Sequence, residues 1–502
     1  MIITITFASL VAVFFVRYIY KLKHARLYRL LEQFPSYPTY PLIGNLHLLF
    51  GSPNSIMQKL DDIARPHNNL VFWWGPIPAL MLTKYRDIST ISNQSNDRNI
   101  QGFTYPWSDV GILTARGNEW KTSKKMLTPA FSTEMLTKYV NVFNKKASDL
   151  ARKFEHVADT EEIIDVFHIV SYINCDASTE NTLGVSIQNC GKGQQFYEAI
   201  SECIKDGVER LFNLWLHPTF MYLAYLKITG KIKFVNHLHD FSTKIIKNIL
   251  NDFRQRPHES NNDNSSESMV HLLLKKNLQE VNMTETRIRD EMIQVLLASM
   301  ETSTVTLSFL MLMLAIHQNI QQKVYEEVEQ FPNDESLTFT QLTNQLQYLE
   351  QCIKETIRLY AHGTIFFRYT NKEHVLDDNK IVPGGIFIIA LTRFAYQDAE
   401  LYANPQKWDP EHFSEKTSTN RPKGSDLLFG YGARSCIGSK YAMMSIKTQI
   451  VYILRKYHLS TNIKELKEDD LGVDLMIRSK PGFPIKFIKR QKIVQNHKIN
   501  HN

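Results

Sequence analysis

One cysteine near the end of the chain stands among glycines and an arginine, in the run FGYGARSCIG (residues 429–438). A helix-forming run from Ser439 to Tyr457 follows it directly. The dipole and the N–H groups at the start of a helix stabilise a thiolate there and lower the pKa of the thiol. Glycines let the backbone pass close to a flat ligand, and Arg434 has the fork geometry to bind a carboxylate. Each part of the run could thus serve a thiolate site beside a flat ligand that carries a carboxylate.

The cysteines as a set show no other metal-binding pattern. They are five in number, widely spaced, without a CxxC pair or a zinc-like Cys/His spacing: Cys175, Cys190, Cys203, Cys352 and Cys436. Such usage indicates reduced thiols in a domain that faces the cytosol. Taken alone, Cys436 would more often be a buried apolar filler, so its functional interpretation depends on the residues around it.

An acid and a hydroxyl are adjacent in the run ASMETS (residues 298–303), inside a long apolar stretch. Glu301 and Thr302 could together deliver protons to a reacting ligand. The alternative is that Thr302 bonds back to a carbonyl one turn earlier and that Glu301 faces solvent. The run by itself leaves both interpretations open.

Two other pairs of residues are spaced by about one helical turn. Glu355 and Arg358 stand at i and i+3, where they can meet on one helix face, and such a pair is by itself most often a surface ion pair. Trp120 and Lys124 are four residues apart, and alone they would be interpreted as a core side chain and a solvated lysine. Both pairs gain meaning only from their context.

The elements that must position these residues are mainly helices. From Thr284 to Gln330 there is no proline and no glycine, which predicts one long helix or two. Short β-like stretches occur at residues 70–74 and 79–82. The runs 475–478 and 485–488 flank a Pro-Gly turn and predict a β-hairpin. The expected fold class is therefore mostly α with a small β region.

The beginning of the chain predicts a membrane anchor. Residues 2–16 are almost wholly apolar, and basic residues follow them. Because no small-residue cleavage site is evident, we favour a signal-anchor transmembrane helix at residues 1–20, with the positive flank keeping the rest in the cytosol. A buried or interfacial helix is the alternative. A basic and proline-rich hinge at residues 21–45 then leads into one large domain, residues 46–502.

Charge and composition limit the partners. The net charge of +7, from 58 Lys and Arg against 51 Asp and Glu, could favour an acidic partner or anionic lipid. No DNA- or RNA-binding motif accompanies this charge, so no nucleic acid partner is expected. The 28 Phe and 22 Tyr residues supply bulk for an interior that could enclose a sizeable apolar ligand.

The run around Cys436 matches the haem-binding signature of the cytochromes P450, F-x-x-G-x-R-x-C-x-G, at every specified position. Its continuation, CIGSKYAM, is similar to the microsomal clan that includes the fatty-acid ω-hydroxylases. Four further segments resemble family motifs in the family's order: residues 106–131, 298–303, 354–360 and 410–413. The resemblance therefore extends over nearly the whole chain.

This resemblance implies the cytochrome P450 fold, with one haem domain behind the anchor. The cofactor is expected to be haem b, held non-covalently apart from the bond between the Cys436 thiolate and the iron. The residues expected to bind it are Trp120, Lys124, Arg368, Phe429, Gly432, Arg434, Cys436 and Gly438. Glu301 and Thr302 are the expected catalytic residues, and Glu355, Arg358 and His412 are expected to form a buried brace behind the haem loop.

The sequence departs from the family at four positions. Ser299 replaces a glycine beside the oxygen site, so the helix should kink less there. Lys124 and His412 replace arginines, which removes a bidentate fork at the first position and makes the brace weaker or pH-sensitive at the second. Ala298 stands where many ω-hydroxylases carry a glutamate esterified to haem, so that bond is not expected.

The implied activity is that of a monooxygenase, which inserts one atom of O₂ into a C–H bond or double bond of a lipophilic small molecule. Electrons are expected from an NADPH-dependent cytochrome P450 reductase, so NADPH is used indirectly, and cytochrome b5 is a second candidate donor. An acidic reductase surface could meet Lys423, Lys440 and Lys447, which could equally be ordinary solvated lysines. The expected location is the endoplasmic reticulum (microsomal) membrane, single-pass, with the catalytic domain facing the cytosol. Substrate contacts are expected at residues 103–113, 298–302 and 361–367 and near Phe483.

Two other functions stay open. A haem-thiolate isomerase or dehydratase would use pre-oxygenated substrates without a reductase, and the intact pair of Glu301 and Thr302 argues against it. A degenerate haem or lipid binder without turnover is conceivable because of Ser299, Lys124 and His412. The sequence does not choose among a fatty acid, a terpenoid, a hydrocarbon and a foreign toxin as substrate.

Overall fold

The computed structural model describes residues 21–490 except positions 41, 99, 101–102, 256–267, 278–282, 333–334, 362, 364 and 474–475. The expected anchor at residues 1–20 and most of the serine- and asparagine-rich run near residue 260 lie outside the described residues. Within the described part, the chain forms two compact units, each assembled from several stretches. We call them the sheet unit (Met1–Asn99, Thr364–Asp398 and Pro422–Ser435) and the helical unit (Ile100–Gly363, Ala399–Arg421 and Cys436–Asn502).

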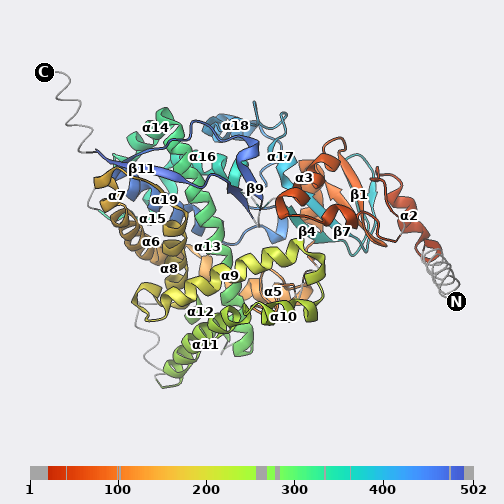
Figure 1. Ribbon diagram of the computed structural model, residues 1–502, viewed down its shortest axis with the longest axis horizontal. Coiled ribbons are helices and arrows are strands. Elements are labelled where there is room, and N and C mark those ends of the chain that lie inside the picture. Colours follow the sequence, from red (N-terminus) through yellow and green to blue (C-terminus); the bar gives the residue numbers. More distant parts are fainter. Residues whose placement is uncertain are drawn as a thin grey trace. The chain divides into compact units, whose positions relative to one another are not determined.

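The sheet unit is built around a four-stranded sheet of order β1-β2-β7-β4, in which only the β2–β7 pair is parallel (Figure 1). Its first two strands are rich in apolar and aromatic residues and are largely buried. The strands are β1 (Asn69–Trp74), β2 (Ile77–Leu82), β4 (Ile365–Tyr369) and β7 (Phe387–Leu391), with a small pair β5 (His374–Val375) and β6 (Ile381–Val382). The helices are α2 (Ala25–Leu31), η1 (Leu46–Leu49), α3 (Pro53–Ala64), α4 (Tyr85–Gln94), α17 (Thr392–Tyr396) and η9 (Gly432–Arg434).

The helical unit is arranged around α13 (Glu285–Ile316), which packs against α8 (Phe167–Leu183), α11 (Ile232–Gln255) and α19 (Ser439–Lys456) (Figure 1). Its other long helices are α5 (Gly117–Leu127), α6 (Thr133–Lys153), α9 (Gly193–Phe212), α10 (Thr219–Ile228), α12 (Met269–Lys276), α14 (Gln318–Val328) and α16 (Gln347–Thr356). Shorter ones are η2 (Thr128–Phe131), α7 (Glu155–Thr160), η3 (Ile187–Asn189), η4 (Leu214–Leu216), α15 (Phe339–Asn344), η7 (Ile357–Ala361), η8 (Pro410–Phe413), α18 (Glu415–Asn420) and η10 (Glu468–Asp470).

The strands of the helical unit form two small sheets. One has the order β3-β11-β8, from β3 (Ile163–Asp165), β11 (Pro484–Lys489) and β8 (Tyr457–Ser460). The other pairs β9 (Leu471–Val473) with β10 (Ile477–Ser479) in antiparallel register. The predicted hairpin between residues 475–478 and 485–488 is therefore wrong, because β10 and β11 belong to different sheets.

Helix α13 forms because 32 successive residues lack proline and glycine, and because the Thr284 hydroxyl caps its start by accepting from the Arg287 N–H at 3.2 Å. It ends at Ile316, and α14 begins at Gln318 after the single residue His317, so the predicted long stretch is two helices. Among the described residues, only α13 is long and apolar enough to cross a membrane, and 83% of its most apolar window is buried inside the protein. The helix is therefore the core of the helical unit.

The fold class predicted from the sequence, mostly α with a small β region, is confirmed. The two β-like stretches near residues 72 and 80 are β1 and β2, and the run after Cys436 is α19. Whether residues 46–502 act as one haem domain stays a prediction.

Candidate functional site

The cysteine side chains differ sharply in their surroundings. Burial raises the pKa of Cys175 to about 12 and also raises the pKa of Cys203 and Cys352 above the ordinary range of a thiol. Cys190 is half-buried, and its pKa is raised as well, again mainly by burial. Cys436 is the exposed thiol among the five. It is thus the cysteine with access to a ligand.

Cys436 lies three residues before Ser439, the first residue of α19, and two residues before the cap residue Gly438. A Cβ atom at Gly438 would lie 4.0 Å from the Cys436 Sγ and 3.6 Å from the Phe131 ring. The glycine therefore leaves the space beside the thiol open, and the sulfur stands where a helix start favours negative charge.

The middle of α13 has one open face. Every residue from Asp290 to Ala315 is buried except Ala298, Ser299 and Thr302, which lie on one side of the helix at i, i+1 and i+4. A core helix with a single exposed turn has space for a ligand against that turn. The predicted oxygen-activation residues lie at this position.

The two predicted catalytic side chains of α13 are already engaged. The Thr302 hydroxyl donates to the Ala298 carbonyl at 2.7 Å, which is the back-bond that the sequence left open. Glu301 does not face solvent, because it is buried and its carboxylate forms an ion pair with the Arg478 guanidinium of β10. Ser299 does not interrupt the helix, since α13 is continuous through this turn. The Glu301 carboxylate and the Thr302 hydroxyl thus bind different partners, Arg478 and the Ala298 carbonyl.

Trp120 and Lys124 lie together on α5. Trp120 is buried, and the Lys124 ammonium lies 5.3 Å from the centre of its ring, a cation–π contact. The two side chains therefore lie on one face of α5, and the Lys124 charge is beside the buried Trp120 ring.

The sheet unit holds a concentration of positive charge. Burial, and then the charges of Arg98 and Arg434, lower the pKa of Arg368 to about 9. Burial and the charge of Arg98 likewise lower the pKa of Arg434 to about 9, although Asp97 opposes this shift. The Nε of Arg368 is buried and makes no hydrogen bond. Three guanidinium groups close together fit a ligand with negative charges.

Gly432 and Arg434 belong to η9, which packs on α4 within the sheet unit. Gly432 has φ +75°, and a side chain there would collide with the Ser92 carbonyl at the end of α4. Arg434 is anchored through a 2.9 Å hydrogen bond from its Nε to the Asn96 carbonyl. The glycine is thus required by the protein's own packing, and Phe429 stands half-buried just before it.

Glu355, Arg358 and His412 meet in the helical unit. Arg358 donates to both Glu355 oxygens at 2.7 and 2.8 Å, and both side chains are fully buried. His412 places Nδ1 3.0 Å from the Glu355 carboxylate and Nε2 2.6 Å from the Ala403 carbonyl. Since both partners are acceptors, only the doubly protonated ring satisfies both, and the Glu355 interactions outweigh burial in raising the pKa of His412.

The remaining backbone contacts close this network. Arg358 also donates to the carbonyls of Pro405 and Lys407, and the Asp409 N–H donates to Glu355 at 2.8 Å. Glu355, Arg358 and His412 thus form one buried hydrogen-bonded network, and its role as a brace behind the haem loop stays a prediction.

Sequence reasoning missed two participants and misjudged a third residue. Arg478, the partner of Glu301, and Arg98, a member of the arginine cluster, stand in no local motif. Lys447 is not a surface lysine, because it is 1% exposed and bonds the Leu342 carbonyl and Glu350. Its assignment to a reductase surface is wrong.

Comparison with known proteins gives a consistent result. The family model for "Cytochrome P450" matches residues 35–485. Cytochrome P450 4d1 of Drosophila melanogaster is 26% identical over 95% of this chain and 96% of its own length. Cytochrome P450 4V2 of Mus musculus is 26% identical over 93% and 92%, and the Homo sapiens protein of the same name is 25% identical over the same shares.

Proposed function

This chain belongs to the cytochrome P450 family and is a haem-thiolate monooxygenase, and from that premise we propose that it oxygenates a lipophilic small molecule with electrons from an NADPH-dependent reductase. The observation that carries the site assignment is the exposed Cys436 thiol at the start of α19, in a chain whose other cysteines are all less exposed. Insertion into a C–H bond or a double bond is the expected outcome.

The residues fit haem b. An exposed thiol would suit a ligand of the haem iron, and the positive cluster of buried Arg368 and Arg434 with half-buried Arg98 would suit propionate groups. Lys124 and the Trp120 indole supply a further cation and N–H donor, although lysine binds a carboxylate as a point charge without the fork of arginine. Gly438 leaves space beside the sulfur. Ala298 has no carboxylate, so the haem is held without an ester bond.

When bound, the haem iron supplies the activation of O₂, and the Cys436 thiolate tunes it. The protein's own part is to hold the sulfur at the helix start, to exclude water and to supply protons. For the last task we propose the open turn of α13, where the Thr302 hydroxyl is accessible and Glu301 lies on the adjoining side. The Glu301 carboxylate is held by Arg478, so proton delivery depends on that pair.

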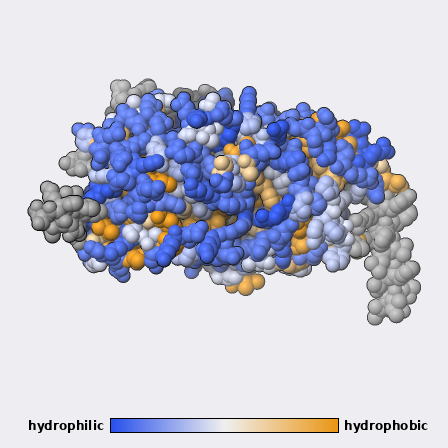
Figure 2. Space-filling view, turned by 90° about the horizontal axis from the view of Figure 1, so that it is seen from above, coloured by the Kyte–Doolittle hydropathy of each residue, from blue (hydrophilic) through white to orange (hydrophobic). Residues whose placement is uncertain are grey.

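Membrane attachment is supported by the surface of the helical unit. The face drawn in Figure 2 is mostly hydrophilic. Three large apolar side chains in and beside α10 are nevertheless strongly exposed. Trp215, Phe220 and Ile228 are 65%, 73% and 86% exposed. Such side chains favour contact with lipid, in agreement with an anchor in the endoplasmic reticulum membrane.

The proposed redox partner is a cytochrome P450 reductase, with cytochrome b5 as a second donor. Lys440, at the first turn of α19, and Lys423 are both exposed. Each could attract an acidic partner surface.

The first test is the carbon monoxide difference spectrum of the reduced protein, compared between wild type and Cys436→Ser. A red-shifted Soret band of the thiolate type that is lost in Cys436→Ser supports the assignment. The half-buried Cys190→Ser is the matched control and should keep the band. A histidine-type band in the wild type, or no haem, would contradict it.

The second test supplies reductase and NADPH to the membrane-bound protein with lipophilic substrates. Product formation coupled to NADPH consumption supports the monooxygenase. Conversion of an organic hydroperoxide without NADPH would instead identify an isomerase or dehydratase. Haem binding without either reaction would identify a degenerate binder.

A further inference from the structure

Residues 103–114 lie between α4 and α5 and contain no helix or strand. Side chains of three helices bind their polar groups. The attachments fall into two sets. Residues 108–114 are held by α13, and residues 103–107 are held by α9 and α11.

The α13 set consists of three side-chain acceptors within five residues of the helix, and each accepts from a backbone N–H group. Asp290 accepts from the N–H of residue 109 at 3.0 Å, Glu291 from residue 112 at 2.8 Å and Gln294 from residue 113 at 2.8 Å. All three side chains are buried. A side chain at Gly111 would collide with Gln294, so segment and helix fit closely.

The α9 set depends on one residue, Arg210, which is 2% exposed. Its two Nη1 donors bond the carbonyls of Phe103 at 2.6 Å and Tyr105 at 2.8 Å. Its other donors bond the carbonyls of Leu216 and His217 and the hydroxyl of Thr219, at 3.1, 3.1 and 3.4 Å: Nε donates to Leu216 and Nη2 to the other two. All five N–H groups of the guanidinium are thus used to join residues 103–105 to the turn after α9.

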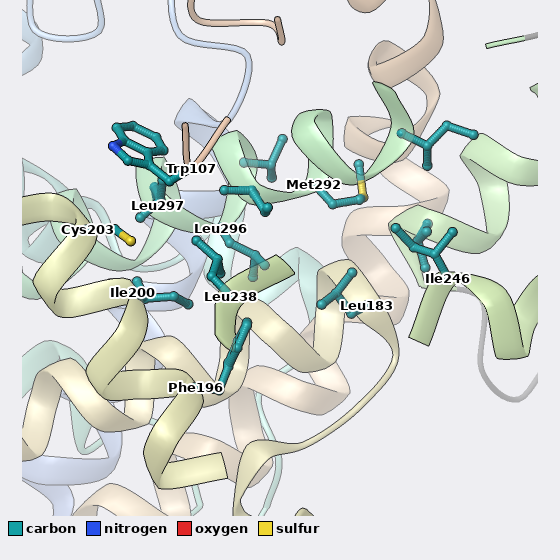
Figure 3. Close-up of a cluster of buried hydrophobic side chains, with 14 of the residues drawn as sticks. Trp107, Leu183, Phe196, Ile200, Cys203, Leu238, Ile246, Met292, Leu296 and Leu297 are labelled. Atoms are coloured by element: carbon teal, nitrogen blue, oxygen red, sulfur yellow. The ribbon is translucent and has the colours of Figure 1, made fainter. Parts of the chain in front are cut away.

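Aromatic contacts complete this attachment. The Arg210 guanidinium lies 5.2 Å from the Phe103 ring centre and 4.4 Å from that of Tyr222. Trp107, at the end of residues 103–107, buries its indole in the apolar cluster of α9, α11 and α13 (Figure 3). The Nε2 atom of His239, on α11, lies 2.9 Å from the Trp107 carbonyl oxygen.

We propose that Arg210 is a specificity-determining positioning residue, which holds residues 103–107 and 214–219 together as one wall and so sets the size of ligand that reaches the haem. This inference rests on the proposed function, in which residues 103–113 contact the substrate. The α13 set fixes residues 108–114 independently of Arg210.

Loss of Arg210 should open this wall without unfolding the protein. The bonding partners described above are neutral carbonyls and a hydroxyl, so their release leaves groups that water can solvate, with no carboxylate among them left unpaired. Lysine keeps the charge but has three donors in place of five, so it cannot restore the joint.

The structural arm of the test is amide hydrogen exchange of the full-length haem protein. Arg210→Gln should speed exchange in peptides covering residues 103–107 and 214–219 by at least about tenfold and leave residues 109–113 unchanged. Arg210→Lys should behave like Arg210→Gln. Arg152→Gln, an exposed arginine of α6, is the control and should change neither segment. Equal acceleration of both segments, or full rescue by lysine, would overturn the inference.

The functional arm compares two azoles that bind haem iron, imidazole and the bulkier 4-phenylimidazole, by the rate of their Soret shift. Arg210→Gln should raise the association rate of 4-phenylimidazole about tenfold relative to imidazole. An unchanged ratio together with faster exchange would refute the specificity role while leaving the proposed function intact. A wild-type protein that gives no Soret shift would refute the proposed function itself, and the size-selection role with it.

Discussion

In the helical unit the buried guanidinium of Arg358 lies against the Glu355 carboxylate, whereas in the sheet unit the buried guanidinium of Arg368 lies near two further guanidinium groups. In the first cluster the Arg358 charge is neutralised by the Glu355 carboxylate, and the guanidinium donors bind acceptors of the protein itself. The second carries an excess of positive charge and a buried Nε without a hydrogen bond. The difference agrees with the proposed roles of the two clusters, a structural brace in the helical unit and propionate binding in the sheet unit.

Breaking the brace should have the largest effect. Glu355→Ala leaves the Arg358 charge buried without its carboxylate, and we expect the free energy of unfolding to fall by about 3–5 kcal/mol. Denaturant unfolding measures this loss. Lys354→Ala, on the same helix and part of a half-exposed pair, should cost less than about 1 kcal/mol. Similar losses for both variants would remove the distinction between brace and surface pair.

The Glu301–Arg478 pair shares features of both clusters. Its two charges neutralise each other, as in the brace, but it adjoins the open turn of α13, where a ligand could bind. Glu301→Gln should lower product formed per NADPH consumed by about 10²-fold if this carboxylate delivers protons. Arg478→Gln should produce a similar loss, and the double variant should be no worse than either single one. Independent, additive effects would show that the pair does not act as a unit.

Arg368→Gln tests the arginine cluster of the sheet unit. We expect this change to raise the stability of the haem-free protein and to weaken haem retention. The haem-free protein should gain about 1–2 kcal/mol in free energy of unfolding, because a poorly compensated buried charge is removed. Haem retention, measured by transfer of haem to apomyoglobin, should weaken about tenfold. Arg26→Gln, exposed and paired with Glu373 in the same unit, should change neither quantity. If Arg368→Gln instead destabilises the haem-free protein, Arg368 has a structural role like that of Arg358.

The smallest expected effect concerns pH and His412. Glu355 raises the pKa of His412 above its ordinary value of 6.5. The stabilisation is therefore complete below pH 6.5 and is lost as the pH rises through the folded-state pKa. Because a charged hydrogen bond becomes a neutral one, we expect a loss of about 1 kcal/mol. His412→Arg should abolish this pH dependence in denaturant unfolding, and a wild-type profile in that variant would contradict the assignment.

Local signals in the sequence predicted much of the fold and of the site. The absence of proline and glycine from Thr284 to Gln330 predicted α13 and α14, and the residues around Cys436 identified the one thiol that the structure leaves exposed. Glu355 and His412, which the resemblance implied to be neighbours, are in hydrogen-bonding contact across 57 positions of the chain, and their role as a brace stays a prediction.

What the sequence did not predict depends on distant segments. Arg478 is 177 residues from Glu301, and no spacing rule connects them. The pairing of β11 with β3 and β8 overrode the Pro-Gly turn that predicted a hairpin, because strand partners are chosen by packing. Lys447 is buried because α19 packs against several helices, among them α6, α13 and α16. Its ammonium bonds Glu350 of α16.

The conformation at Gly432 bears on the stability of the polypeptide itself. The left-handed backbone of this glycine is enforced by the end of α4, and Arg434 is tied to the Asn96 carbonyl, so these residues take their shape from contacts within the sheet unit. Any larger side chain at position 432 would therefore strain the haem-free protein as well as the haem-bound one.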